Sequence, residues 1–119
     1  MTAAECVQAA RVAGELYQGP INELIDEFRR AAPGERRRIA AAPVESSGKI
    51  EGLVAAVISA LCREVGMPVP DWVGVTGSPE PFFAFPARSY AMRVRLMLES
   101  PPPFRVRNVF VPASYLSRA

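Results

Sequence analysis

Apolar residues recur at helical spacing over the first two thirds of the chain. The longest example, from about Gly48 to Val65, predicts a central core helix because its apolar positions follow the i, i+3, i+4, i+7 rule. Gly66 is the residue type that commonly ends a helix in the left-handed conformation, and Ser46 and Ser47 are candidate N-caps. The apolar positions are Ile50, Leu53, Val54, Val57, Ile58, Leu61, Cys62 and Val65.

Three shorter helices are predicted before it. Thr2 and Glu5 form a capping-box pattern for the first, which we expect Gly19-Pro20 to end. Its apolar positions are Cys6, Ala9, Ala10, Ala13, Leu16 and Tyr17. The second helix has a one-face stripe of Ile21, Leu24, Ile25 and Phe28, and the third, over 35–42, has Ile39 as its anchor and Pro43 as its end.

The segment 67–88 is rich in proline and aromatic residues, which predicts an ordered loop rather than a helix. Trp72 is expected to pack over the helical core with its indole N–H bonded. Phe82, Phe83 and Phe85 are expected to hold the loop to the core.

The last segment, 89–119, is predicted to begin with a fifth helix capped by Ser89 and running to about Glu99. Ser100-Pro101 has the pattern of an N-cap followed by proline at the first position of a short helical turn. Asn108 is a candidate left-handed stop, followed by an extended segment. The residues of the fifth helix expected to face inward are Tyr90, Val94, Met97 and Leu98.

These elements predict an all-α fold, a single compact domain of about five helices. It comprises a helical body (1–66), a Pro/aromatic-rich loop (67–88), and a C-terminal helix with a basic tail that has an extended segment (89–119). No apolar run approaches the ~20 residues of a membrane span, and the N-terminal residues lack the pattern of a signal peptide. We therefore expect a cytoplasmic location and no membrane partner.

Charge is unevenly distributed along the chain. Residues 1–80 contain eight Arg or Lys and eleven Asp or Glu, a net charge of −3, whereas residues 81–119 contain six Arg and one Glu, a net charge of +5. A basic C-terminal third favours a partner with a negative surface. Docking of this segment on the acidic body of the same chain would explain the division equally well.

Histidine is absent from the sequence. Ser-His-Asp and Cys-His mechanisms and histidine-based zinc sites are therefore excluded, and no cofactor is expected. Cys6 and Cys62 lie among apolar residues, so they are interpreted as core fillers rather than a disulfide or a catalytic thiol. An enzyme using carboxylates or Ser/Tyr chemistry is the least supported of three functional hypotheses.

Three polar features have both a functional and a structural interpretation. The cluster 36–38, of three arginines, could bind phosphate, but a solvated helix face balanced by Glu35 is favoured. The segment 46–49, Ser-Ser-Gly-Lys, lacks the spacing of a phosphate-binding loop, so a helix cap is favoured. Asp71 is interpreted as a turn or cap acid.

The C-terminal segment is the strongest candidate site. Its aromatic residues could pack on the protein's own helices while the arginines extend into water. Alternatively the segment forms part of an interface, since arginine and aromatic residues dominate interface energetics. Both interpretations stay open, and both can hold together. The candidate partner-binding residues are Arg93, Phe104, Arg105, Arg107, Asn108 and Phe110.

Two motifs carry a resemblance to a known group of proteins. A Gly-x-Pro-x-Pro-x-Trp turn (Gly66, Pro68, Pro70, Trp72) precedes a block matched by Glu99, Ser100, Pro101, Phe104, Arg105, Arg107, Asn108, Phe110 and Val111. Over 66–119 the chain resembles small proteins common in actinobacteria that are encoded beside nucleotidyltransferase-like genes of the toxin–antitoxin type. The resemblance implies an antitoxin-like companion of such a toxin, and no catalytic residues are carried over from it.

The first functional hypothesis is accordingly a non-enzymatic protein-binding module. The alternative is a nucleic-acid-binding transcriptional regulator that uses the 36–38 cluster with the C-terminal arginines. The winged-helix domain of many antitoxins is not recognisable in this sequence, and that argues against the alternative. The identity of the partner and the oligomeric state are left open.

Overall fold

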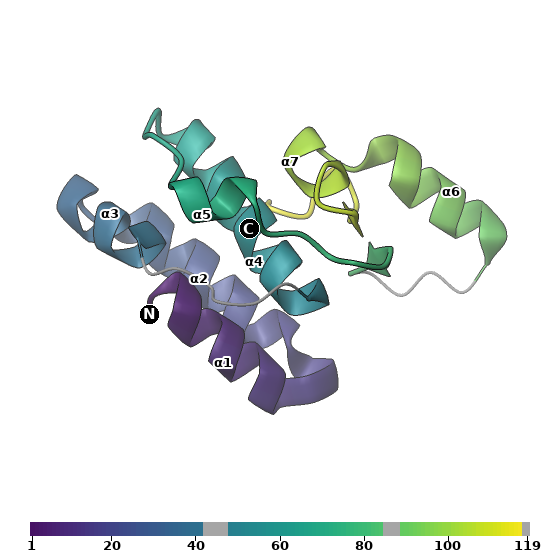
Figure 1. Ribbon diagram of the computed structural model, residues 1–119, viewed down its shortest axis with the longest axis horizontal. Coiled ribbons are helices and arrows are strands. Elements are labelled where there is room, and N and C mark those ends of the chain that lie inside the picture. The colour runs from purple at the N-terminus through teal and green to yellow at the C-terminus, as the bar shows by residue number, and fades with distance from the viewer. Residues whose placement is uncertain (42–47, 85–88, 118–119) are drawn as a thin grey trace.

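The protein is described here by a computed structural model covering residues 1–41, 48–84 and 89–117. This part of the chain is largely all-α, as the apolar spacing predicts (Figure 1). The radius of gyration of the Cα atoms is 13.4 Å, close to the roughly 13.5 Å of a compact domain of this length. No helix in these three ranges combines the length and apolarity that crossing a membrane requires.

Helix α4 (Lys49–Glu64) is the central element of the fold. It contacts α1 (Ala3–Ala13), α2 (Gln18–Arg30) and the short α7 (Pro102–Arg105). Helix α3 (Pro33–Ala41) packs against α1 and α2. Twelve of the sixteen residues of α4 are buried, which confirms it as the core helix that its apolar periodicity predicts.

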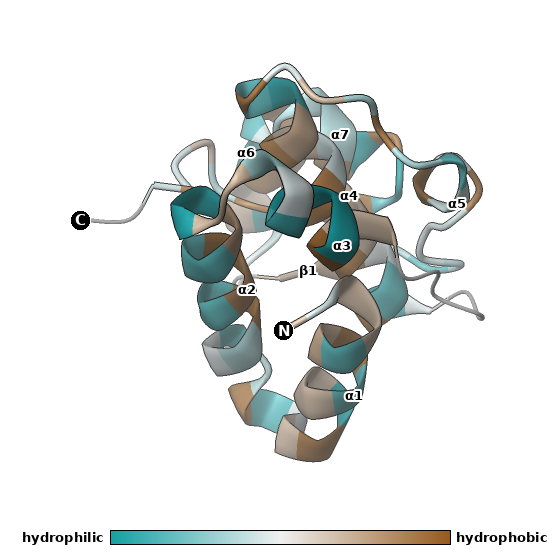
Figure 2. Ribbon diagram, turned by 90° about the vertical axis from the view of Figure 1, so that its left-hand side faces the viewer, coloured by the Kyte–Doolittle hydropathy of each residue, from teal (hydrophilic) through white to brown (hydrophobic). Residues whose placement is uncertain are grey.

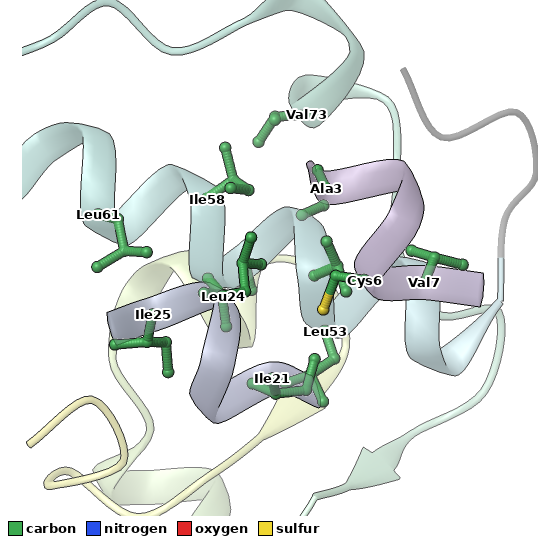
Figure 3. Close-up of a cluster of buried hydrophobic side chains, with 14 of the residues drawn as sticks. Ala3, Cys6, Val7, Ile21, Leu24, Ile25, Leu53, Ile58, Leu61 and Val73 are labelled. Carbon is green, nitrogen blue, oxygen red and sulfur yellow. The ribbon is translucent and has the colours of Figure 1, made fainter. Parts of the chain in front are cut away.

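The core forms where the apolar faces of α1, α2 and α4 meet (Figure 3). The predicted stripe of α2 is confirmed, since all four of its residues are buried. Figure 2 shows that the side of α2 facing away from the core is hydrophilic. Residues drawn in this cluster include Ala3, Cys6, Val7, Ile21, Leu24, Ile25, Leu53, Ile58, Leu61 and Val73.

The C-terminus of α4 ends as its sequence predicts. Gly66 has a φ of 70°, in the left-handed region that favours glycine. Its N–H donates to the carbonyl of Arg63 at 3.2 Å, and the N–H of Met67 donates to the carbonyl of Cys62 at 2.9 Å. This pair of bonds is the Schellman motif, which satisfies carbonyls that the helix leaves without a partner.

Helix N-termini match the predictions in part. The capping box of α1 is confirmed, because Thr2 and Glu5 exchange both expected hydrogen bonds. The N-cap of α4 is Gly48. Ser46 and Ser47, the predicted caps, lie outside the described residues, as does Pro43.

The boundary between the first two helices lies earlier than predicted. Helix α1 ends before Gly14, whose φ of 60° interrupts the helix, and a 3₁₀ turn, η1 (Gly14–Leu16), follows. Gly19 and Pro20 lie in the first turn of α2, where a missing N–H costs no helical hydrogen bond. Leu16, an apolar position assigned to the first helix, lies in this turn and is 78% exposed.

The Pro/aromatic segment contains more regular structure than predicted. It includes a short helix, α5 (Asp71–Gly74), and a strand, β1 (Phe82–Phe83), which pairs in parallel with β2 (Val109–Phe110). The prediction for Trp72 is confirmed, since its indole N–H donates to the carbonyl of Ala40 at 2.8 Å. Phe85 lies outside the described residues.

The turn between α6 (Tyr90–Glu99) and α7 depends on a buried serine. The expectation that Ser100 caps α7 is wrong, because Pro101 is the N-cap residue. The hydroxyl of Ser100 instead accepts from the N–H of Val111 at 2.7 Å and lies 2.6 Å from the carbonyl of Leu96. These bonds join the end of α6 to the segment after β2.

Candidate functional site

The two candidate aromatic residues of the C-terminal segment lie inside the protein. Phe104 is fully buried and meets the ring of Tyr115 edge-on, with 5.6 Å between centroids. Phe110 is also buried, beside Leu96 and with its ring centroid 5.2 Å from that of Phe83. Both rings therefore pack on the protein's own side chains, and neither is available to a partner at the surface.

Arg107 and Asn108 bind the backbone of the same chain. The guanidinium of Arg107 donates to the carbonyls of Val73, at 3.2 and 3.1 Å, and of Pro103, at 2.7 Å. Burial of this group lowers the pKa of Arg107 from its ordinary value. Asn108 has the predicted left-handed conformation, with a φ of 62°, and its side-chain amide donates to the carbonyl of Ser78. Arg107 therefore fastens the C-terminal segment to α5, and Asn108 fastens it to the loop after α5.

Three other arginines of the C-terminal third lie at the surface. Arg93 is exposed, with its guanidinium 5.5 Å from the ring centroid of Phe83. Arg95 is 81% exposed and forms an ion pair with Glu99 at 3.2 Å. Arg105 is exposed on α7. This end of the molecule consequently presents positive charge to the solvent.

Helix α6 exposes apolar side chains that its periodicity was expected to bury. Tyr90 is 84% exposed, Leu98 74% and Met97 46%, and Val94 is partly buried. The inward orientation expected for Tyr90, Met97 and Leu98 is therefore wrong. We call Tyr90, Val94, Met97 and Leu98 the α6 stripe. Figure 1 shows α6 at one end of the long axis, away from α1, α2 and α3.

The face of α6 that contacts the body is narrow. Leu96 is the buried residue of this helix, and it packs with Phe110 and Phe83. Ser89 caps the helix as predicted, accepting from the N–H of Met92 at 3.1 Å. Sequence reasoning missed Leu96, because a single leucine between arginine and methionine has no periodic pattern to mark it. Its burial turns the α6 stripe away from the protein.

The arginine cluster 36–38 is largely engaged within the chain. Arg36 donates to the carbonyls of Phe28 at 3.0 Å and Arg29 at 2.9 Å, so it caps the C-terminus of α2. Arg38 pairs with Glu35 at 2.8 Å, in agreement with the favoured interpretation of a balanced, solvated face. These bonds leave the cluster poorly arranged to hold a phosphate.

The remaining polar candidates do not assemble into a catalytic group. Lys49 lies over the ring of Phe82, with its ammonium 5.6 Å from the centroid. Asp71 is exposed and borders a mainly apolar pocket of about 400 Å³ beside Trp72 and Arg37. The lining of this pocket contains a single carboxylate, so it lacks the paired acids of general acid–base catalysis.

Both cysteines are buried and free, which confirms their interpretation as core residues. Burial raises the pKa of the Cys6 thiol to about 12 and also raises the pKa of Cys62. Within the described ranges, no three Cys, His, Asp or Glu residues lie close enough together to hold a metal ion.

Neither thiol is expected to react with a thiol reagent in the folded protein at mildly alkaline pH. The reactive form is the thiolate, and burial both blocks access and holds each thiol protonated. Labelling with a chromogenic disulfide reagent, in buffer and in denaturing guanidinium chloride, tests this expectation. Fast labelling of either cysteine before unfolding would contradict it.

The α6 stripe and its neighbouring arginines are therefore the candidate site that the described geometry supports best. Apolar residues exposed together on a soluble protein mark interaction surfaces, and aromatic, methionine and arginine side chains are enriched in protein interfaces. No protein-family model, curated protein or solved structure matches this chain.

Proposed function

We propose that this chain is a non-enzymatic protein-binding module whose contact surface is the α6 stripe. The observation that carries the proposal is the exposure of Tyr90, Met97 and Leu98 on a helix that buries Leu96. Full burial of a large apolar side chain contributes roughly 1.5–3 kcal/mol of favourable free energy relative to leaving it exposed. A partner that covers these side chains would supply the burial that α6 does not obtain within its own chain.

The proposed partner is a nucleotidyltransferase-like toxin, for which this chain acts as the antitoxin-like companion. The resemblance of 66–119 to proteins encoded beside such toxins supports this choice. Charge supports it too, since metal-binding carboxylates make the active-site cleft of a nucleotidyltransferase negative. Arg93, Arg95 and Arg105 present positive charge at the same end of the molecule as the stripe.

Co-expression with the product of the adjacent gene, followed by a binding assay on the purified proteins, tests the function. Leu98→Glu is expected to weaken the complex by at least about tenfold, because it places a charge in the apolar contact. Thermal unfolding should change little, since Leu98 is 74% exposed.

Leu16→Glu is the matched control. It introduces the same substitution at a leucine of similar exposure, 78%, outside α6. The affinity of this variant for the product of the adjacent gene should equal that of the unmodified chain. Absence of a complex at micromolar concentration, or equal weakening by both substitutions, would contradict the proposed function.

A further inference from the structure

We infer that the segment that covers the α6 stripe is an acidic amphipathic α-helix of the partner. This inference rests on the proposed function and adds the chemistry of the occupant.

The shape of the stripe matches a helix. Tyr90, Val94, Met97 and Leu98 follow the i, i+4, i+7, i+8 spacing of one helical face. Over the ten residues of α6 this face is a narrow ridge about 15 Å long. In coiled-coil terms the first three residues occupy alternating core positions. A second helix packs along such a ridge, whereas a small ligand requires a concave pocket.

The charge beside the stripe matches an acidic partner. At 100° per residue, Arg93 and Arg95 lie on opposite sides of the stripe. The ring of Phe83 positions the guanidinium of Arg93. Residues 89–117 contain four arginines and one acid, Glu99. Carboxylates on both sides of a partner's apolar seam would pair with the flanking arginines, as charged residues beside a coiled-coil core do. Arg95 would exchange its exposed ion pair with Glu99 for the partner's carboxylate.

The same charges disfavour two other occupants. Pairing α6 with a second copy of itself would place Arg93 and Arg95 near the arginines of the other copy, and like charges across an interface are destabilising. A nucleic-acid duplex would neutralise the arginines but would leave Tyr90 and Leu98 in water, because its backbone offers phosphates rather than apolar surface.

Two synthetic peptides test the inference with the full-length protein. Each has about three heptads and a leucine seam; one carries glutamate beside the seam and the other lysine at the same positions. By fluorescence anisotropy at low salt, the acidic peptide is expected to bind about tenfold more tightly than the basic one. The preference should shrink at high salt.

Variants locate the binding on α6. Leu98→Glu should abolish binding of the acidic peptide, and the control Leu16→Glu should preserve it. Arg95→Glu should lower the affinity for the acidic peptide several-fold and raise that for the basic one. Arg95→Glu breaks the exposed ion pair with Glu99 and places two glutamates at i, i+4, so the thermal unfolding temperature should fall only slightly.

Three results would overturn the inference: equal binding of the two peptides, no binding of either, or self-association that Leu98→Glu removes. The last would identify a second copy as the occupant. The proposed function fails separately, if Leu98→Glu leaves the complex with the adjacent gene product intact. A complex that depends on Leu98 but not on Arg95 would retain the proposed function and reject the acidic helix.

Discussion

Phe104→Ala is expected to lower the free energy of unfolding by about 3–5 kcal/mol. Phe104 is fully buried on α7, the helix that packs on the central α4. Removing its ring loses the transfer free energy of the aromatic group and leaves a cavity, and it also removes the edge-on contact with Tyr115. The expected loss is large because Phe104 is the largest fully buried side chain of the C-terminal segment.

Urea denaturation followed by circular dichroism measures this change. Val106→Ala is a suitable control, since Val106 lies two residues away and is 76% exposed. The control should alter stability by no more than about 0.5 kcal/mol. A loss below about 1 kcal/mol for Phe104→Ala would contradict the packing role and return Phe104 to the set of partner-binding candidates.

Gly52→Ala is expected to destabilise the protein by about 1–3 kcal/mol. In an exposed helix interior the same change stabilises by up to about 1 kcal/mol. In α4, however, a Cβ at Gly52 would lie 2.7 Å from the backbone nitrogen of Ser78 and 3.0 Å from the carbonyl carbon of Gly77. The loop cannot retreat freely, because the N–H of Ser78 donates to the carbonyl of Arg107 at 2.9 Å.

Gly34→Ala is the matched control for this prediction. Gly34 lies in α3, where an added Cβ would meet no atom within 4 Å. Urea denaturation should show a loss of stability for Gly52→Ala and no loss for Gly34→Ala. If both substitutions stabilise the protein, α4 and the 77–78 loop do not approach each other as closely as described.

Features that depend on neighbouring residues were predictable from the sequence. The capping box at Thr2, the serine cap at Ser89, the helix end at Gly66 and the left-handed Asn108 all match the structure. Each of these conformations is determined by hydrogen bonds or backbone sterics within about four residues. The periodicity of α4 was equally informative, since a helix apolar on most sides has to be buried.

The candidate site was predictable only in part. The sequence directed attention to the C-terminal third and to its arginines, and it placed the α6 stripe on one helical face. Periodicity shows which residues share a face, but it does not show whether another element covers that face. The tertiary structure decides this, because the packing of Leu96 against Phe110 and Phe83 turns Tyr90 and Leu98 outward.

By itself, then, the sequence determined the five longer helices, several of their ends, the apolar core and the absence of histidine chemistry. Only the tertiary structure decided that β1 pairs with β2, that Ser100 bonds to Val111, and that the C-terminal aromatic residues pack within the chain. The physical reason is the separation along the chain of the residues that interact. Caps and helical periodicity act between near neighbours, whereas burial depends on segments that meet only after the chain has folded.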